Sequence, residues 1–178
     1  SNNDLCDSST DPDGPEHNGL SSFGKKVVEK MNDLGMMVDV SHISDASFYD
    51  VLEVSEDPVI ASHSCARTLC DHPRNLNDQM LQALKENGGV IQICLVSDYL
   101  KKPDPQPARD SAFAALREKY GGFKNLTQEE MAKARKEWRL LQKKYPKKLA
   151  SVKDVVDHID HVVNTIGIDY VGIGTDFD

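Results

Sequence analysis

The stretch Gly35-Met36-Met37-Val38-Asp39-Val40-Ser41-His42 sets the pattern from which the fold can be predicted. It follows residues 21–34, in which apolar side chains recur at helical spacing, and Gly35 is a typical residue to end such a helix. The apolar run 36–38 is too short for a buried helix, so a buried parallel strand fits it best. His42 stands directly after this predicted strand.

The same order of helix, turn and strand then returns along the chain. Ser44 can cap the next helix, and Ser151 with Asp154 resembles a capping box, with Asp in place of the usual Glu. Further helices are expected over 78–85 and from 151 to Gly167, and strands over 59–62, 90–96 and 170–173. Four such repeats predict an α/β fold with a parallel sheet and helical crossovers.

A doubly wound sheet and a (β/α)8 TIM barrel both fit this pattern. No G-x-G-x-x-G motif or P-loop follows any predicted strand, which removes the main nucleotide-binding signatures. Four strands are half of a barrel, and a complete barrel needs roughly 250 residues. The sequence therefore favours the C-terminal half of a barrel whose other half lies upstream, and both ends of the chain are expected to be cut.

Two segments depart from the repeat. Residues 1–20 are rich in Asp, Ser, Pro and Gly and are expected to form a loop. After Lys101, a proline-rich connection leads to two polar helices, predicted over 110–120 and 127–145. Because this part offers few apolar positions for a core, residues 101–150 are predicted to be a helical insertion within one barrel domain, 1–178.

Composition excludes some classes of partner. The chain of 178 residues carries a formal net charge of −8, which argues against nucleic acid, since phosphate binding needs clustered Lys and Arg. Basic residues do gather over 133–148, but Glu129, Glu130 and Glu137 lie beside and among them, as on a solvated helix face. No apolar run approaches the roughly 20 residues of a membrane span, so membrane association is not evident, and the compartment stays open.

Polar residues follow the predicted strands at equivalent places. His42 and His63 end two consecutive strands, and Asp176 follows the last strand. Ligands and catalytic groups of parallel α/β folds gather at these strand ends, and neighbouring strands lie about 4.8 Å apart. Two imidazoles so placed can reach one metal ion, and their neutral nitrogens suit zinc. A catalytic zinc usually takes three protein ligands, so the rest are expected from outside this chain.

These segments resemble the successive motifs of the membrane (renal) dipeptidase family, the zinc peptidases of family M19. The likeness runs in the right order through nearly the whole chain except the insertion. It is carried by Val38-Asp39-Val40-Ser41-His42, Pro58-Val59-Ile60-Ala61-Ser62-His63-Ser64, Asp71-His72-Pro73-Arg74-Asn75 and Gly172-Ile173-Gly174-Thr175-Asp176-Phe177-Asp178.

The resemblance implies a hydrolase with two zinc ions on a (β/α)8 barrel, which cleaves dipeptides through a metal-activated water. By this likeness His42 and His63 bind one zinc ion, and Arg74 holds the terminal carboxylate of the substrate. Asp176 matches the catalytic aspartate, and Asp39 and Asp178 are weaker candidates for supporting the site.

The departures from the family pattern also matter. The family uses a His-x-Asp pair near its N-terminus, a bridging glutamate and a substrate-binding histidine. The one His-x-Asp in this chain, His158-Ile159-Asp160, lies within the helix predicted from 151 to Gly167 and does not match that pair. Ligands for the other zinc ion are therefore not visible, and the chain taken alone is expected to be inactive. Two alternatives stay open, another metal-dependent amidohydrolase on the same barrel or an inactive fragment. Residues 101–150 could form either a lid or a homodimer contact, and the sequence does not decide between the two.

Overall fold

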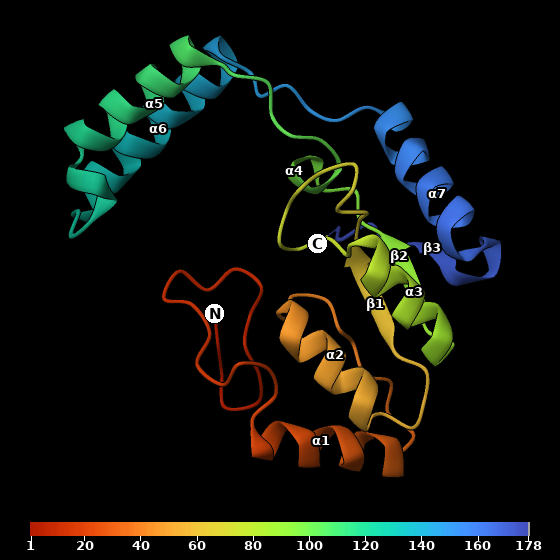
Figure 1. The fold of residues 1–178 in the computed structure, drawn as a ribbon. Helices are drawn as coiled ribbons and strands as arrows, with labels where there is room; N and C mark the ends of the chain where they lie inside the picture. Colours follow the sequence, from red (N-terminus) through yellow and green to blue (C-terminus); the bar gives the residue numbers. More distant parts are fainter. Residues whose placement is uncertain (178) are drawn as a thin grey trace. The chain divides into compact units, whose positions relative to one another are not determined.

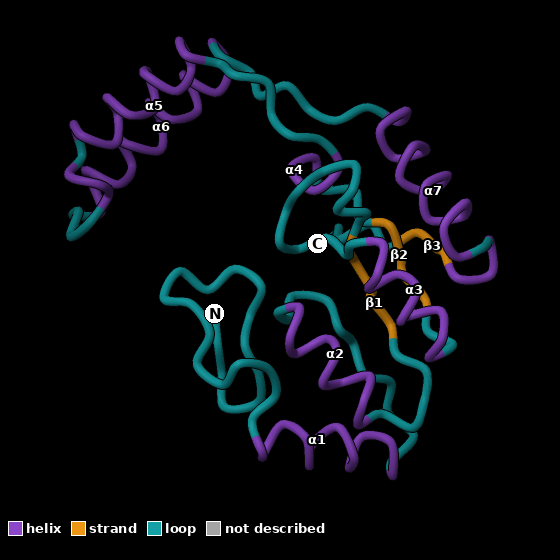
Figure 2. The backbone as a smooth tube through the Cα atoms, in the orientation of Figure 1, coloured by secondary structure: helices purple, strands orange, loops and turns teal. Residues whose placement is uncertain are grey.

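The computed structural model describes residues 1–177 and shows an α/β protein (Figures 1 and 2). Contacts between residues divide it into two compact units. The first unit comprises Ser1–Lys102 and the segment that begins at Ala150, and the second comprises Pro103–Leu149. The elements are α1 Ser22–Asp33, α2 Asp45–Val54, β1 Ile60–Ser64, α3 Asp78–Asn87, β2 Val90–Ile93, α4 Ser97–Leu100, α5 Pro107–Lys119, η1 Gly121–Phe123, α6 Gln128–Lys144, α7 Val152–Ile166, η2 Ile168–Tyr170 and β3 Val171–Ile173.

The helices of the first unit begin at the capping residues expected from the sequence. The Ser44 hydroxyl accepts the backbone N–H of Ser47 at the start of α2. At the start of α7, Ser151 and Asp154 form the predicted capping box, each side chain accepting the backbone N–H of the other. These bonds satisfy N–H groups that a helix cannot pair internally. Gly167 ends α7 at φ 107, a region that favours glycine.

The sheet is parallel, in the order β1-β2-β3, with Ile60 opposite Val90 and Ile91 opposite Val171. Among the described residues these are the regular strands, so the prediction of four strands was wrong. The predicted first strand is reduced to a single bridge, in which Val40 and Val38 exchange backbone hydrogen bonds with Ile60 at 2.8 and 3.0 Å.

The reason for this difference lies in the start of the predicted strand. Met36 and Met37 are exposed, at 53% and 65%, whereas Val38 and Val40 are buried. The apolar run therefore enters the core only at its end. The sequence pattern could not show this, because a methionine side chain counts as apolar whether or not neighbours cover it.

The core of the first unit lies between the sheet and the helices that follow each strand. Helices α3 and α7 contact each other, and both contact β2. Their inward side chains share one cluster with those of β2, formed by Leu81, Leu84, Ile91, Ile93, Val162 and Ile166. Each of these is at most 1% exposed, so the cluster is a close-packed core.

The second unit is a helical hairpin in which α5 and α6 lie side by side, joined through η1 (Figure 1). Its interior is small, since Leu116 and Ala134 are the buried hydrophobic residues found there. An aromatic contact supplements it, with the rings of Phe113 and Trp138 edge to face at 4.6 Å. In the part of the chain described here, no helix is long and apolar enough to span a bilayer.

Candidate metal and substrate site

The two predicted metal ligands meet in the structure. His63 lies in β1, one residue before its end, close to the strand end at which it was predicted. His42 follows the bridge segment at φ 76, an unusual backbone conformation for a residue other than glycine. The Nε2 atoms of the two rings face each other at 2.8 Å. Both side chains therefore present a ring nitrogen to the same point.

A hydrogen-bond chain determines which nitrogen of His63 carries its proton. The Ser62 hydroxyl donates to the Asp39 carboxylate and also contacts His63 Nδ1 at 2.7 Å. A hydroxyl has one proton, so toward His63 it can only accept, and Nδ1 must carry the hydrogen. The lone pair of His63 is then on Nε2, directed at His42. Such a support is typical of metal-binding histidines.

The charge of Asp39 supports this chain. Burial alone would raise the pKa of Asp39, but hydrogen bonds from Ser62 and Ser41 hold this pKa below its ordinary value. The carboxylate is thus ionised at neutral pH and accepts from Ser62. The suggestion that Asp39 helps to orient a ligand stays a prediction, now with a bonded path to His63.

Asp176 follows β3 at the carboxyl end of the sheet, where the chain comes close to β1. The N–H of Gly174 bonds to the carbonyl of Ile93 at 3.0 Å. A Cβ at Gly174 would lie 1.9 Å from the carbonyl oxygen of Ser62, so only glycine allows this approach. Asp176 follows, exposed, at φ 57.

Arg74 brings a buried positive charge next to the histidines. It is 4% exposed, and its Nη2 donates to the His63 carbonyl at 3.2 Å. Its guanidinium lies over the Tyr99 ring, 5.4 Å from the centroid, and its Nε has no hydrogen-bond partner among residues 1–177. Within the described residues no carboxylate forms an ion pair with it. A buried guanidinium in this state is prepared to bind an anionic group.

The electrostatics of His42 show that these groups act on one another. Burial lowers the pKa of His42, and the charges of Arg74 and His63 lower it further. Asp176 and Asp39 act in the opposite direction. The net lowering favours neutral imidazole, the form that binds metal.

The ligand set is incomplete within the described residues. The donors suit zinc, since two neutral imidazole nitrogens converge and one has a fixed tautomer. No group of three or more His, Cys, Asp or Glu side chains able to hold a metal ion occurs among residues 1–177. A metal ion here would need further ligands from outside this chain. Asp178, the weaker candidate beside Asp176, lies outside the described residues.

Two further histidines have contacts that support the fold. His72 accepts the Arg74 backbone N–H on Nδ1 at 3.1 Å. His158 is 1% exposed and bonds the backbone of Ala66 and Leu100. Sequence reasoning missed the roles of Ser62 and Tyr99, which appear only when distant segments are brought together.

Comparison with known proteins now places the chain. The family described as Membrane dipeptidase (Peptidase family M19) matches residues 1–178. Dipeptidase tcpJ of Claviceps purpurea is 36% identical over 177 residues, which cover 99% of this chain and 31% of that protein. Human dipeptidase 3 is 38% identical over 160 residues, or 90% of this chain and 24% of that protein.

A solved structure gives the same result. The probable dipeptidase PvdM from Pseudomonas aeruginosa superposes with a TM-score of 0.76 at 32% identity, over all of this chain and 49% of that one. The chain thus spans about a quarter to a third of these curated relatives, and half of this solved relative. By its sequence and its fold, the chain belongs to the membrane dipeptidase family of metallopeptidases, M19.

Proposed function

We propose that this chain is part of a zinc-dependent dipeptidase whose complete form is a (β/α)8 barrel. One observation carries the proposal: buried Arg74, without a carboxylate partner in the described chain, adjoins two histidines with converging Nε2 atoms. These residues lie at or after the carboxyl ends of parallel strands, which is where such barrels carry their active sites. Residues 103–149 would then be the core of the proposed helical insertion.

In this proposal the substrate is a dipeptide bound by its C-terminal carboxylate. Arg74 can offer two parallel N–H donors to that carboxylate, and the low exposure of the guanidinium strengthens the attraction. An anchor at the terminal carboxylate fixes the peptide bond one residue away. This anchor selects the last peptide bond of a substrate and excludes cleavage further from its C-terminus; a limit to dipeptides would be set by groups outside this chain.

The histidines would hold one of two proposed zinc ions, and the ligands of the other would lie outside this chain. Zinc, when bound, lowers the pKa of water and polarises the peptide carbonyl. The Asp39–Ser62 pair keeps the His63 Nε2 lone pair available. Asp176 would accept the proton of the attacking water and pass it to the leaving amine.

The test is hydrolysis by the full-length protein of a dipeptide and of its C-terminal amide, with zinc and after chelation. We expect zinc-dependent cleavage of the dipeptide. The amide should react at least about 30-fold more slowly, because leaving a buried charge unpaired costs about 2–5 kcal/mol. Equal rates for the two substrates would contradict the role of Arg74 and favour another metal-dependent amidohydrolase. Cleavage that survives chelation would contradict the metal.

A further inference from the structure

The loop between β1 and α3, residues 65–77, carries Arg74 and is bonded to the start of α2 by another arginine, Arg67. The Arg67 guanidinium forms a two-pronged ion pair with Asp45, with Nη1–Oδ2 and Nη2–Oδ1 distances of 2.6 and 2.7 Å. Asp45 is the first residue of α2, three residues after His42. The ion pair therefore joins the arginine loop to the segment of a metal-ligand candidate.

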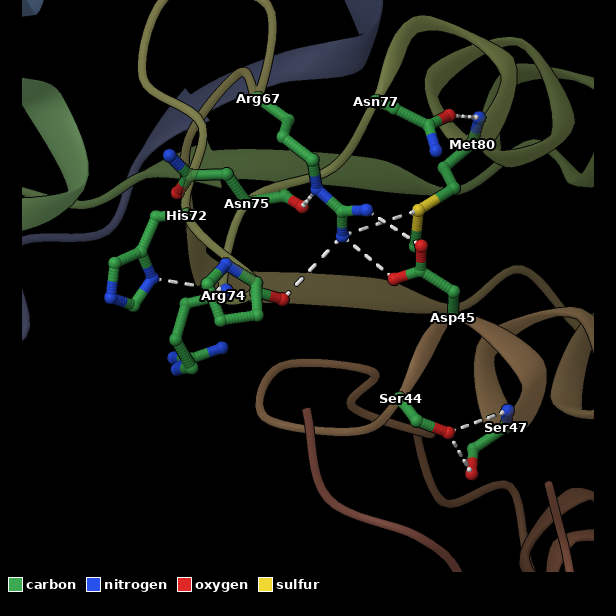
Figure 3. Close-up of polar contacts among 10 residues, drawn as sticks. Ser44, Asp45, Ser47, Arg67, His72, Arg74, Asn75, Asn77 and Met80 are labelled. Atoms are coloured by element: carbon green, nitrogen blue, oxygen red, sulfur yellow. Dashed lines mark hydrogen bonds and ion pairs between the residues drawn. The ribbon is translucent and has the colours of Figure 1, made fainter. Parts of the chain in front are cut away.

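Arg67 also bonds the loop itself. Its Nε donates to the carbonyl of Asn75 at 2.8 Å, the residue next to Arg74. Its backbone N–H donates to the carbonyl of Leu76 at 2.8 Å. The guanidinium thus joins α2 to the C-terminal part of the loop, next to Arg74, and Figure 3 shows it between Asn75 and Asp45.

Arg67 and Arg74 have separate environments. In Figure 3 the Arg74 side chain points away from the ion pair with Asp45. Arg67 has its charge neutralised by a carboxylate, whereas Arg74 has only carbonyl and ring contacts in the described chain. The pairing leaves Arg74 as the arginine available to an incoming anion and gives Arg67 no role in contacting substrate.

We propose that Arg67 is a positioning residue that sets where Arg74 stands relative to the two histidines. The inference rests on the proposed function, in which Arg74 binds the substrate carboxylate. Lysine cannot replace Arg67, since an ammonium group lacks the planar fork that serves Asp45 while Nε serves the loop. Displacing Arg74 by a fraction of an ångström would weaken the carboxylate contact without removing any catalytic group.

The test compares Arg67→Met and Arg67→Lys with the wild type in the full-length zinc-loaded protein, using a dipeptide and its C-terminal amide. We expect KM for the dipeptide to rise roughly 10- to 100-fold in Arg67→Met, as for a misplaced binding group, with kcat changed far less. Cleavage of the amide should slow only a little in the variant. The preference of the enzyme for the substrate with a free carboxylate should therefore shrink. Arg67→Lys should show the same pattern, less strongly.

Asp45→Asn and a matched control make the test specific. In the double variant Asp45→Asn/Arg67→Met, KM for the dipeptide should rise no more than in Arg67→Met alone, because the two residues act through one contact. Lys153→Met removes the exposed ion pair with Asp157, whose distance is also 2.6 Å, and should leave both substrates unaffected.

Each outcome decides the matter. Equal losses for dipeptide and amide, or a fall in thermal stability with an unchanged preference, would show a merely structural role and overturn the inference. If the wild type cleaves the dipeptide and the Arg67 variants keep its KM and kcat, this inference is overturned and the proposed function still stands. A folded, zinc-loaded wild type that cleaves no dipeptide would overturn the proposed function, and this inference with it.

Discussion

The two units of the chain use polar residues in opposite ways. In the first unit, polar and charged side chains lie in the interior, namely Asp7, Ser41, Ser47, Ser55, Ser64, Arg74, Asn75 and His158. In the hairpin 103–149, no charged or polar residue reaches that degree of burial. The hairpin holds more than half of the Lys and Arg of the chain, but only about a fifth of its Asp and Glu.

The difference shows where the structure gives up stability for chemistry. Burying a polar group is costly unless each of its bonds is made. Asp7 makes them, accepting the backbone N–H groups of Glu16, His17 and Gly19. Arg74 does not, since its Nε has no hydrogen-bond partner in the part of the chain that the structure describes. Cost of this kind collects at functional sites, and in Arg74 it lies next to His63, whose carbonyl Arg74 contacts.

Deleting core side chains should give the largest contrast between the units. Leu84, 0% exposed in α3, lies in the core beneath the sheet, whereas Leu140 in α6 is 57% exposed. We expect Leu84→Ala to lower the free energy of unfolding by about 2–5 kcal/mol, from lost burial and the cavity left behind. Leu140→Ala should change it by less than about 0.5 kcal/mol. Urea unfolding of the intact protein measures both, and equal losses would break the comparison.

A smaller effect concerns pH and the buried His158. Burial lowers the pKa of His158, although the bond to Leu100 opposes this. Its Nδ1 accepts the N–H of Ala66 at 3.0 Å, so the neutral ring is the form the fold requires. Because the pKa of His158 is lower in the folded than in the unfolded protein, its contribution to the free energy of unfolding is complete above the unfolded pKa of about 6.5. The contribution falls as pH decreases below that value.

The measurement is the unfolding free energy of wild type and His158→Gln from pH 8 to pH 5. We expect the variant to be less stable by about 1–3 kcal/mol at pH 8, from the buried N–H left unpaired. The difference should shrink toward pH 5, because the variant lacks the titrating group. Asp7, whose pKa is lowered by its three backbone donors despite burial, responds only at lower pH and should not affect this window. A difference that stays constant with pH would contradict the account.

The same two regions show what could be predicted from the sequence. Helices with local signals were found, since a cap such as Ser44 or the pair Ser151 and Asp154 acts within one turn. His42, His63, Arg74 and Asp176 were identified as site candidates. The structure brings the first three into contact, and the charge of Asp176 acts on His42. The features that could not be predicted depend on contacts between residues far apart in the sequence. The Asp39–Ser62 support joins residues 23 positions apart, and the Arg67–Asp45 pair joins residues 22 apart.

The most direct test that His42 and His63 bind zinc in a dipeptidase is the zinc content of the full-length protein, measured by elemental analysis alongside dipeptide hydrolysis. His42→Ala and His63→Ala should each bind less zinc than the wild type and lose most activity. His161→Ala is the control, since that histidine pairs with Asp78 at 2.7 Å in the α7–α3 contact, and it should keep both. Full zinc content and activity in His63→Ala would contradict the assignment of the two histidines as ligands.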